Sequence, residues 1–173
     1  MENENGQELS EANFFTTEEL YTLASLVNEQ LAGVVYHYWV NKASETPFEV
    51  LDYITLAFRS GNALTLTAGE ESDGLKITEP DFNAIRTRLE AEFKGKVTIE
   101  SRDVSKHKLW KEALGRELTP SLMRYEGRVL NDSLVLKFPD SDSIEIFLGL
   151  EGMEVDYFDE DNELYLSDVE AQP

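Results

Sequence analysis

The sequence predicts a single α+β domain, built from two related antiparallel β-hairpin units and about three helices. The first observation behind this prediction is an internal repeat, since residues 54–71 align with residues 134–151 without a gap. The second is that apolar residues recur at helical spacing in three other segments. The third is the length of 173 residues, which suits one domain, without a glycine- and serine-rich linker that would divide it.

Each repeat unit consists of an alternating strand, a polar turn, a second alternating strand, an acidic loop and a short third strand. The units span about 50–78 and about 130–158. Equivalent positions carry similar residues: Leu56 and Leu136, Phe58 and Phe138, Leu64 and Ile144, Leu66 and Ile146, Gly69 and Gly149, Glu71 and Glu151, and Leu75 and Val155. Because alternate residues of a strand share one face, each unit has an apolar face to bury. We expect Phe58 and Phe138 to occupy equivalent core positions.

A helix is predicted over about 17–32, followed by a strand over residues 34–40. Thr16 and Glu19 have the spacing of a capping box, in which each side chain bonds to the backbone of the other residue. One face of the strand carries Tyr36, Tyr38 and Val40, and the other carries Val35, His37 and Trp39. One set is expected in the core. The other is either covered by a helix or forms an exposed aromatic patch of the kind found at interfaces.

Two further helices are predicted, over about 80–94 and about 105–114, on the same face of the sheet as the first. Lysines and arginines surround Trp110 in the third helix, so an anion or RNA contact with the indole stacked on a base is one interpretation. Helical spacing instead places Trp110 on the apolar side, with Leu109 and Ala113. We therefore expect Trp110 in the core.

The two ends of the chain are predicted as tails. Residues 1–13 are polar and acidic and read as a mobile acidic tail, residues 14–166 as the α+β domain, and residues 167–173 as a second tail. Residues 164–166 are predicted as an edge strand at the end of the domain. An exposed edge can pair with a neighbouring chain, so a structural or assembly role is one interpretation.

The chain is strongly acidic, and its charge is unevenly distributed. Thirty-five acidic residues oppose 15 Lys and Arg, which gives a net charge of −20 at pH 7. Neither residues 1–32 nor residues 138–173 contain Lys or Arg, whereas most basic residues lie between Arg86 and Arg128. Neutralisation of the acidic ends by the basic middle is the expected arrangement. A negative field repels phosphate, so nucleic acid is an unlikely partner and a membrane is not expected.

Sequence motifs for catalysis or metal binding are not found. The chain has no cysteine, and neither of its two histidines, His37 and His107, has a second histidine at ligand spacing. Phosphate-binding loops and nucleophile elbows are missing as well. Asp159, Asp161 and Glu163 resemble the start of a calcium loop, but the required glycine and the closing Glu are missing. The sequence predicts a non-enzymatic protein without cofactor or metal, and its lack of cysteine fits a cytoplasmic location.

The main functional hypothesis is a small acidic protein that neutralises or regulates a basic protein partner, such as an immunity protein or an inhibitor. Two acidic loops follow equivalent strands of the repeat, and an acidic turn follows the second loop. The predicted partner-binding residues are Glu70, Glu71, Asp73, Glu151, Glu154, Asp156, Asp159, Glu160 and Asp161. They converge into one patch if the repeats stack and separate if the repeats are related by a rotation within one sheet. An alternative is a small-ligand-binding protein or enzyme with a site between the two repeats.

Overall fold

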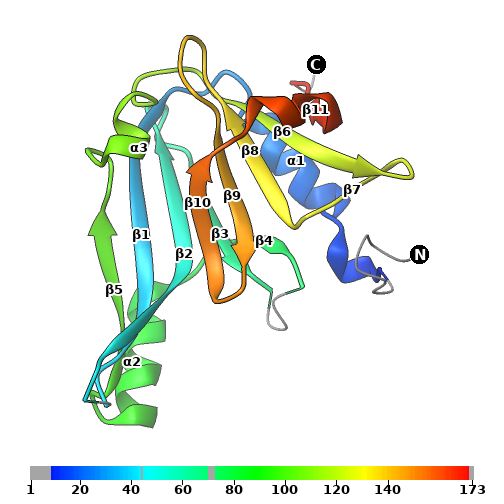
Figure 1. The fold of residues 1–173 in the computed structure, drawn as a ribbon. Coiled ribbons are helices and arrows are strands. Elements are labelled where there is room, and N and C mark those ends of the chain that lie inside the picture. Colours follow the sequence, from blue (N-terminus) through cyan, green and yellow to red (C-terminus); the bar gives the residue numbers. More distant parts are fainter. Residues whose placement is uncertain (1–8, 44, 70–72, 172–173) are drawn as a thin grey trace.

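The computed structural model describes residues 9–43, 45–69 and 73–171 (Figure 1). It shows the predicted α+β fold, in which two antiparallel sheets are stacked. Sheet one has the order β4-β3-β2-β1-β5, and sheet two has the order β10-β9-β8-β6-β11, with the short β7 paired to β6. The strands of sheet one are β1 (Leu31–Asn41), β2 (Phe48–Phe58), β3 (Ala63–Ala68), β4 (Leu75–Thr78) and β5 (Val97–Asp103). Those of sheet two are β6 (Thr119–Tyr125), β7 (Arg128–Val129), β8 (Ser133–Lys137), β9 (Ile144–Gly149), β10 (Gly152–Tyr157) and β11 (Leu166–Asp168).

The repeat predicted from the sequence is present, with one copy in each sheet. In β2 and β3, Ile54 pairs with Leu66 and Leu56 with Leu64. The residues 80 positions later pair in the same way in β8 and β9: Leu134 with Ile146 and Leu136 with Ile144. The two hairpins therefore have the same register, and their apolar faces are turned toward each other.

The third strands of the two copies differ in register, which corrects one predicted equivalence. Leu75 pairs with Ala68, whereas Val155 pairs with Ile146, so Val155 is not the counterpart of Leu75. Met153, opposite Leu148, takes that place in sheet two. The cause is loop length, because a tight turn joins β9 to β10 while a longer loop joins β3 to β4.

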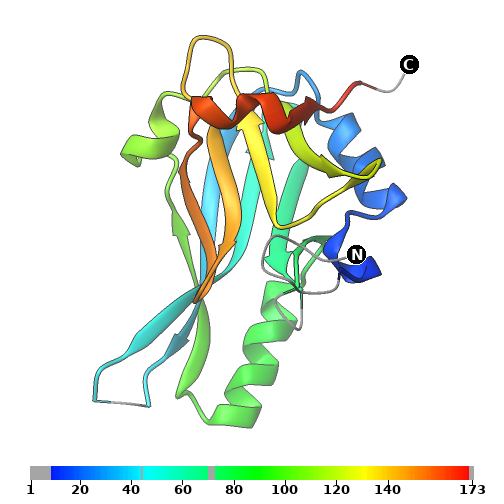
Figure 2. The same cartoon turned by 45° about the vertical axis from the view of Figure 1, so that its right-hand side comes forward.

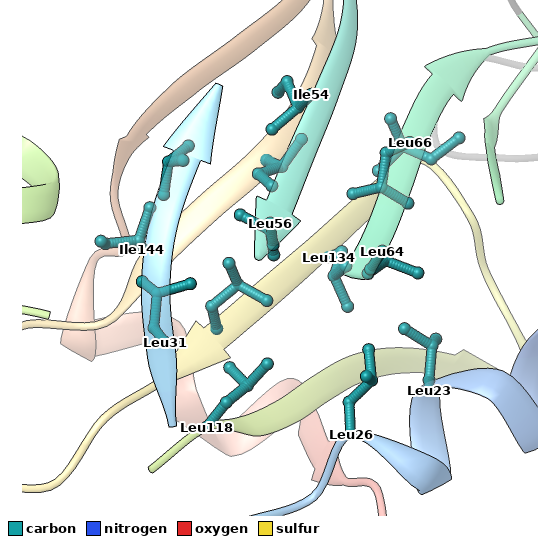
Figure 3. Packing of buried hydrophobic residues seen from close by; sticks show 14 of the residues in the cluster. Leu23, Leu26, Leu31, Ile54, Leu56, Leu64, Leu66, Leu118, Leu134 and Ile144 are labelled. Carbon is teal, nitrogen blue, oxygen red and sulfur yellow. The ribbon is translucent and has the colours of Figure 1, made fainter. Parts of the chain in front are cut away.

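The space between the sheets is filled by apolar side chains of both repeats (Figure 3). Phe58 is 3% exposed and Phe138 is 6% exposed, which confirms the prediction that both are core residues. Residues from sheet one, sheet two and helix α1 (Thr17–Ser25) form one cluster that includes Leu23, Leu31, Ile54, Leu56, Leu64, Leu66, Leu118, Leu134, Leu136, Ile144 and Ile146. The surface between the repeats is thus a packed core, so a ligand site there, as in the alternative above, gains no support.

Helix α1 begins as predicted and ends earlier. The Thr16 N–H donates to Glu19 Oε1 at 3.0 Å, and the Glu19 N–H donates to Thr16 Oγ1 at 3.1 Å, which completes the capping box. The helix ends at Ser25 instead of continuing to about residue 32. Asn28 takes a left-handed conformation with φ 69°, and its N–H donates to the Leu118 carbonyl at 2.8 Å. Tertiary pairing with the segment before β6 therefore ends the helix.

Helix α2 (Phe82–Phe93) packs on the opposite side of sheet one from α1 (Figure 2). Its Leu89 forms a separate buried cluster with Val97 and Ile99 of β5. The expectation that the helices share one face is wrong, since α1 belongs to the core between the sheets. The open question about β1 is also answered, because Trp39 packs against this second cluster, and α2 covers part of its face.

Helix α3 (Lys108–Lys111) is shorter than the predicted segment 105–114. Trp110 is 0% exposed, as expected for a core residue, and its Nε1–H donates to the Tyr36 hydroxyl at 2.7 Å. Burial and this hydrogen bond remove the indole from any stacking contact with a base. Burial, reinforced by repulsion from Tyr38 and opposed by the bond from Trp110, raises the pKa of Tyr36 to about 12.

Both segments predicted as tails contain residues that join the fold. The 3₁₀ helix η1 (Glu11–Asn13) lies in the predicted amino-terminal tail, and Arg128 reaches from sheet two to the Glu11 carboxylate at 2.7 Å. At the other end, β11 extends to Asp168, which accepts a hydrogen bond from the Ser121 hydroxyl at 2.8 Å. Residues 164–165 belong to the 3₁₀ helix η2 (Glu160–Tyr165), so the edge strand begins at Leu166.

Candidate functional site

The outer surface of sheet two carries a group of carboxylates. Ile144, Ile146 and Met153 face the core, so the residues between them on β9 and β10 project outward. Asp156 lies opposite Glu145 in the β9–β10 ladder, and Glu154 lies opposite Phe147 on the same surface. Asp132, directly before β8, is close enough to repel Glu145. We call Asp132, Glu145, Glu154 and Asp156 the acidic face.

Burial disfavours ionisation of Glu145 and Asp132, and repulsion from neighbouring carboxylates adds to this effect at Glu145. Burial raises the pKa of Glu145, the Ser133 hydroxyl lowers it, and the neighbouring Asp132 and Asp156 raise it further. Desolvation also raises the pKa of Asp132, although this residue keeps an exposed surface. The Ser133 hydroxyl is buried close to Glu145, and its contact with that carboxylate falls short of full hydrogen-bond geometry. Positive charge brought to this surface would relieve the repulsion.

The acidic face continues into η2, which combines carboxylates with exposed apolar side chains. Asp159 caps η2 by accepting the Asp161 N–H at 3.0 Å, and Glu160 and Glu163 lie on its exposed surface. Leu164 is 93% exposed and Tyr165 is 70% exposed. Large apolar groups within a charged surface are typical anchor residues of protein interfaces.

A hollow of about 890 Å³ adjoins this segment. Leu164 and Tyr165 of η2 line one wall, and Met123 and Tyr125 of β6 line another. Asp132 of the acidic face and Arg124 of β6 also line the hollow, so charged and aromatic groups meet there. Its volume is in the range of ligand clefts, so it has room for several side chains of a binding partner.

Few of these carboxylates are neutralised within the chain. Two ion pairs join the acidic ends to basic residues, Arg128 with Glu11 at 2.7 Å and Lys137 with Asp168 at 3.1 Å. Within the described part of the chain, no ion pair reaches the acidic face or residues 159–163. The expected neutralisation by the basic middle therefore involves the outermost acids and leaves this surface with unbalanced negative charge.

The predicted partner-binding residues are distributed along the length of the sandwich. Glu70 and Glu71 lie outside the described residues. Asp73 and Glu151 lie at the end of the sandwich that holds the β3–β4 and β9–β10 loops (Figure 1). Glu154 and Asp156 belong to the acidic face, and Asp159, Glu160 and Asp161 follow at the opposite end of β10. The stacking of the repeats places both loops at one end, while the η2 acids lie at the other.

Sequence reasoning missed Asp132, Glu145, Leu164 and Tyr165. Alternation within β9 could have identified Glu145, because it lies between the core residues Ile144 and Ile146. The position of Asp132 depends on how β8 pairs with β9, and the apolar residues of η2 resembled an edge strand in the sequence. Asp132, Leu164 and Tyr165 could be assigned to this surface only from the three-dimensional structure.

A polar network on the other sheet involves His37, which is 5% exposed. Its Nδ1 lies 2.7 Å from Ser101 Oγ, and its Nε2 lies 2.9 Å from Thr55 Oγ1. Arg86 can only donate, and it bonds to Ser101 Oγ at 3.0 Å, so the Ser101 proton is free to point at Nδ1. This arrangement favours neutral His37 with its proton on Nε2.

Burial, reinforced by repulsion from Arg86, lowers the pKa of His37 to about 4. Phe82 of α2 stacks on the ring at a centroid distance of 3.9 Å. Both ring nitrogens face hydroxyl groups, so the carboxylate partner of a Ser-His-Asp triad is replaced by a hydroxyl here. A histidine with this pKa is a weak base at neutral pH, and the network joins α2 to sheet one.

Among the residues that the structure describes, no three His, Asp or Glu side chains are placed to hold a metal ion. None of the helices in the described ranges is long and apolar enough to cross a membrane. Comparisons with known protein families, with curated proteins and with solved structures find no match to this chain.

Added salt is expected to raise the melting temperature at pH 7. With a net charge of −20, screening should weaken repulsion across the acidic surface more than it weakens the few exposed ion pairs. Thermal unfolding followed by circular dichroism at low salt and in about 0.3 M NaCl, where the Debye length is roughly halved relative to 0.1 M, measures the effect. Arg102 and Glu49 form one of these exposed pairs, at 2.6 Å. A flat or falling response would show that such pairs outweigh the repulsion.

Proposed function

We propose that the protein is a non-enzymatic binding protein that neutralises or regulates a basic protein partner, in the manner of an immunity or inhibitor protein. The observation that carries the proposal is the continuous surface formed by the acidic face and η2. It joins carboxylates that form no ion pair with any described residue to the exposed Leu164 and Tyr165. Charge complementarity on such a surface accelerates encounter, and apolar anchors then slow dissociation.

The electrostatics of the acidic face support a cationic partner. Repulsion from Asp132 and Asp156 helps to raise the pKa of Glu145, so the free protein stores unfavourable carboxylate interactions at this surface. Lys or Arg side chains of a partner would favour the ionised carboxylates and remove that cost. The same field repels phosphate groups, so the proposal is for a basic protein and not for nucleic acid.

Apolar contacts define where on this surface the partner would be held most tightly. Leu164 and Tyr165 stand at the edge of the hollow that Met123 and Tyr125 also line. A partner side chain inserted there would contact both aromatic rings and exclude water from the neighbouring Asp132 carboxylate. Interfaces commonly concentrate their binding energy at such anchors, with charged residues around them.

Charge reversal on η2 is the direct test. Replacing Glu160 and Glu163 by Lys leaves the Asp159 cap intact and is expected to lower the association rate constant by about tenfold, with a smaller change in dissociation. The partner is first captured by a photoreactive group at position 165, and its binding kinetics are then measured at two salt concentrations.

The matched control reverses Glu90 and Glu92, which lie on α2 and give the same change in net charge. The proposal predicts that this control keeps most of the association rate, since α2 lies on the other side of sheet one (Figure 2). Equal effects of the two double variants would show that total charge matters and that the η2 surface has no special role. An association that is indifferent to salt would count against the proposal as well.

A further inference from the structure

A second candidate site lies on the outer surface of sheet one, away from the acidic face. An open cavity of about 450 Å³ lies between β1, β2 and β5 on one side and α2 on the other. Its lining combines apolar groups with two aromatic rings, one carboxylate and one guanidinium group: Trp39, Tyr53, Asp52, Arg88, Val50, Ile85, Leu89 and Ile99. The site does not depend on the function proposed for η2.

A β-bulge places the carboxylate in this cavity. In the β1–β2 ladder His37 pairs with Tyr53 and the next residue, Tyr38, pairs with Leu51, so Asp52 has no partner across the strands. An extra residue of this kind bends the strand locally and redirects a side chain, and such bulges are common beside binding sites. Here the bulge brings Asp52 and its neighbour Tyr53 into the same cavity.

The Asp52 carboxylate lacks a counter-charge within the described part of the chain. Its side chain makes no ion pair among the described residues, and the Thr67 hydroxyl donates to its backbone carbonyl at 2.8 Å, not to the carboxylate. Burial raises the pKa of Asp52, so the environment disfavours the lone negative charge. The same carboxylate raises the pKa of Tyr53, after burial as the larger cause.

Arg88 lines the cavity as well, but it does not neutralise Asp52. No ion pair joins the two among the described residues, and burial is the only cause of the shift at Asp52. Arg88 instead acts on Tyr53, where its positive charge partly offsets the rise in pKa that burial and Asp52 cause. Because Arg88 forms no ion pair with Asp52, the carboxylate can accept a cationic group of a ligand.

We propose that this cavity binds an alkylammonium or guanidinium group, with the Asp52 carboxylate as counter-ion and the Trp39 and Tyr53 rings as walls. An aromatic wall attracts a cation through the negative face of the ring, and a nearby carboxylate adds a direct charge interaction. Phe48 extends the aromatic surface, since its ring centroid lies 5.6 Å from that of Trp39. The cation is either a small free amine or the side chain of Lys or Arg in a peptide.

The two tryptophans provide an internal reporter and an internal reference for a ligand titration. The chain contains only these two, so the indole N–H signals of a ¹⁵N-labelled sample separate the cavity from the core. Trp39 lines the cavity, whereas Trp110 is fully buried and bonded to Tyr36. Titration with tetramethylammonium chloride is expected to shift the Trp39 signal in a saturable manner and to leave the Trp110 signal in place. Tert-butanol, neutral and similar in shape, and NaCl at matched concentration are expected to produce no saturable shift.

Two variants give opposite expected results. Asp52→Asn keeps the side-chain shape and is expected to weaken tetramethylammonium binding by roughly tenfold. Arg88→Gln removes a like charge and is expected to keep or strengthen binding. Unchanged affinity in Asp52→Asn, equal shifts with tert-butanol, or loss of binding in Arg88→Gln would overturn the proposal, the last because it would indicate an anionic ligand group held by Arg88.

A second arm identifies the source of the cation. N-acetyl-lysine methylamide and a short lysine-containing peptide are compared with a free alkylamine on the same Trp39 signal. Tighter binding of the peptide assigns the cavity to a protein side chain, and tighter binding of the free amine assigns it to a small molecule. Unfolding midpoints of both variants, matched to that of the wild-type protein, show that any loss of binding is local.

Discussion

Truncation of either repeated phenylalanine, Phe58→Ala or Phe138→Ala, is expected to lower the free energy of unfolding by about 3–5 kcal/mol. Both rings are buried in the one cluster that unites the two sheets. Each substitution removes a large apolar group and leaves a cavity that the surrounding side chains fill only partly. The loss is comparable with the whole stability of a marginal domain, so urea unfolding at low temperature is the suitable measurement.

The equivalence of the two positions makes the experiment specific. Similar losses at Phe58 and Phe138 are expected, because the residues occupy matching places in hairpins of the same register. Tyr21→Ala is the control, since this ring is 57% exposed on α1 and its loss should cost less than about 1 kcal/mol. A loss below about 1 kcal/mol at one of the two phenylalanines would show that the copies do not share the core equally.

The second large effect concerns pH and His37. The pKa of His37 is about 4 in the folded protein, against an ordinary value of 6.5, because burial and Arg86 disfavour the charged ring. Between pH 6.5 and about pH 4, His37 is therefore mostly protonated in the unfolded chain and mostly neutral in the folded protein. Stability from this residue is complete above pH 6.5 and is lost as the pH falls toward 4. Between pH 7 and pH 5 the loss is expected to be about 2 kcal/mol.

Glutamine at position 37 isolates this effect. Its amide can accept from Ser101 and donate to Thr55, as the neutral imidazole does, without titrating. Carboxylates with a raised pKa, such as Asp52 and Glu145, make the folded protein more stable as the pH falls. They contribute equally in the wild-type protein and in His37→Gln. Urea unfolding at pH 7 and pH 5 measures how much the free energy of unfolding changes with pH in the wild-type protein and in His37→Gln. Parallel changes in the two proteins would show that His37 does not titrate in this way.

Much of the fold could be predicted because it depends on local sequence patterns. The alternation around Phe58 and Phe138 fixes which side chains face the core, and the capping box at Thr16 fixes where α1 begins. Features that depend on distant contacts could not be predicted. The end of α1 depends on a bond from Asn28 to Leu118, and the slip that replaces Val155 by Met153 depends on how a short turn pairs two strands.

The candidate sites follow the same division. The acidity of residues 138–173 is visible in the sequence, and on this basis Glu154, Asp156 and Asp159 are predicted to bind a partner. The neighbourhood of Asp132 and Glu145 and the exposure of Tyr165 result from strand pairing and from the course of η2. Asp52 gave no sequence signal at all, because a bulge is a property of two paired strands and not of one.

The common register of the two hairpins has a consequence for the order of events during folding. Within each hairpin the paired residues are close in sequence, so the hairpin can close early and quickly. The two hairpins meet across a separation of about 80 residues, which requires closure of a long intervening chain and should come late. Until then the chain exposes two nearly identical apolar faces, each of which fits the other and also fits its counterpart on a second molecule. Exchange of hairpins between chains is therefore the characteristic error open to this protein while it folds.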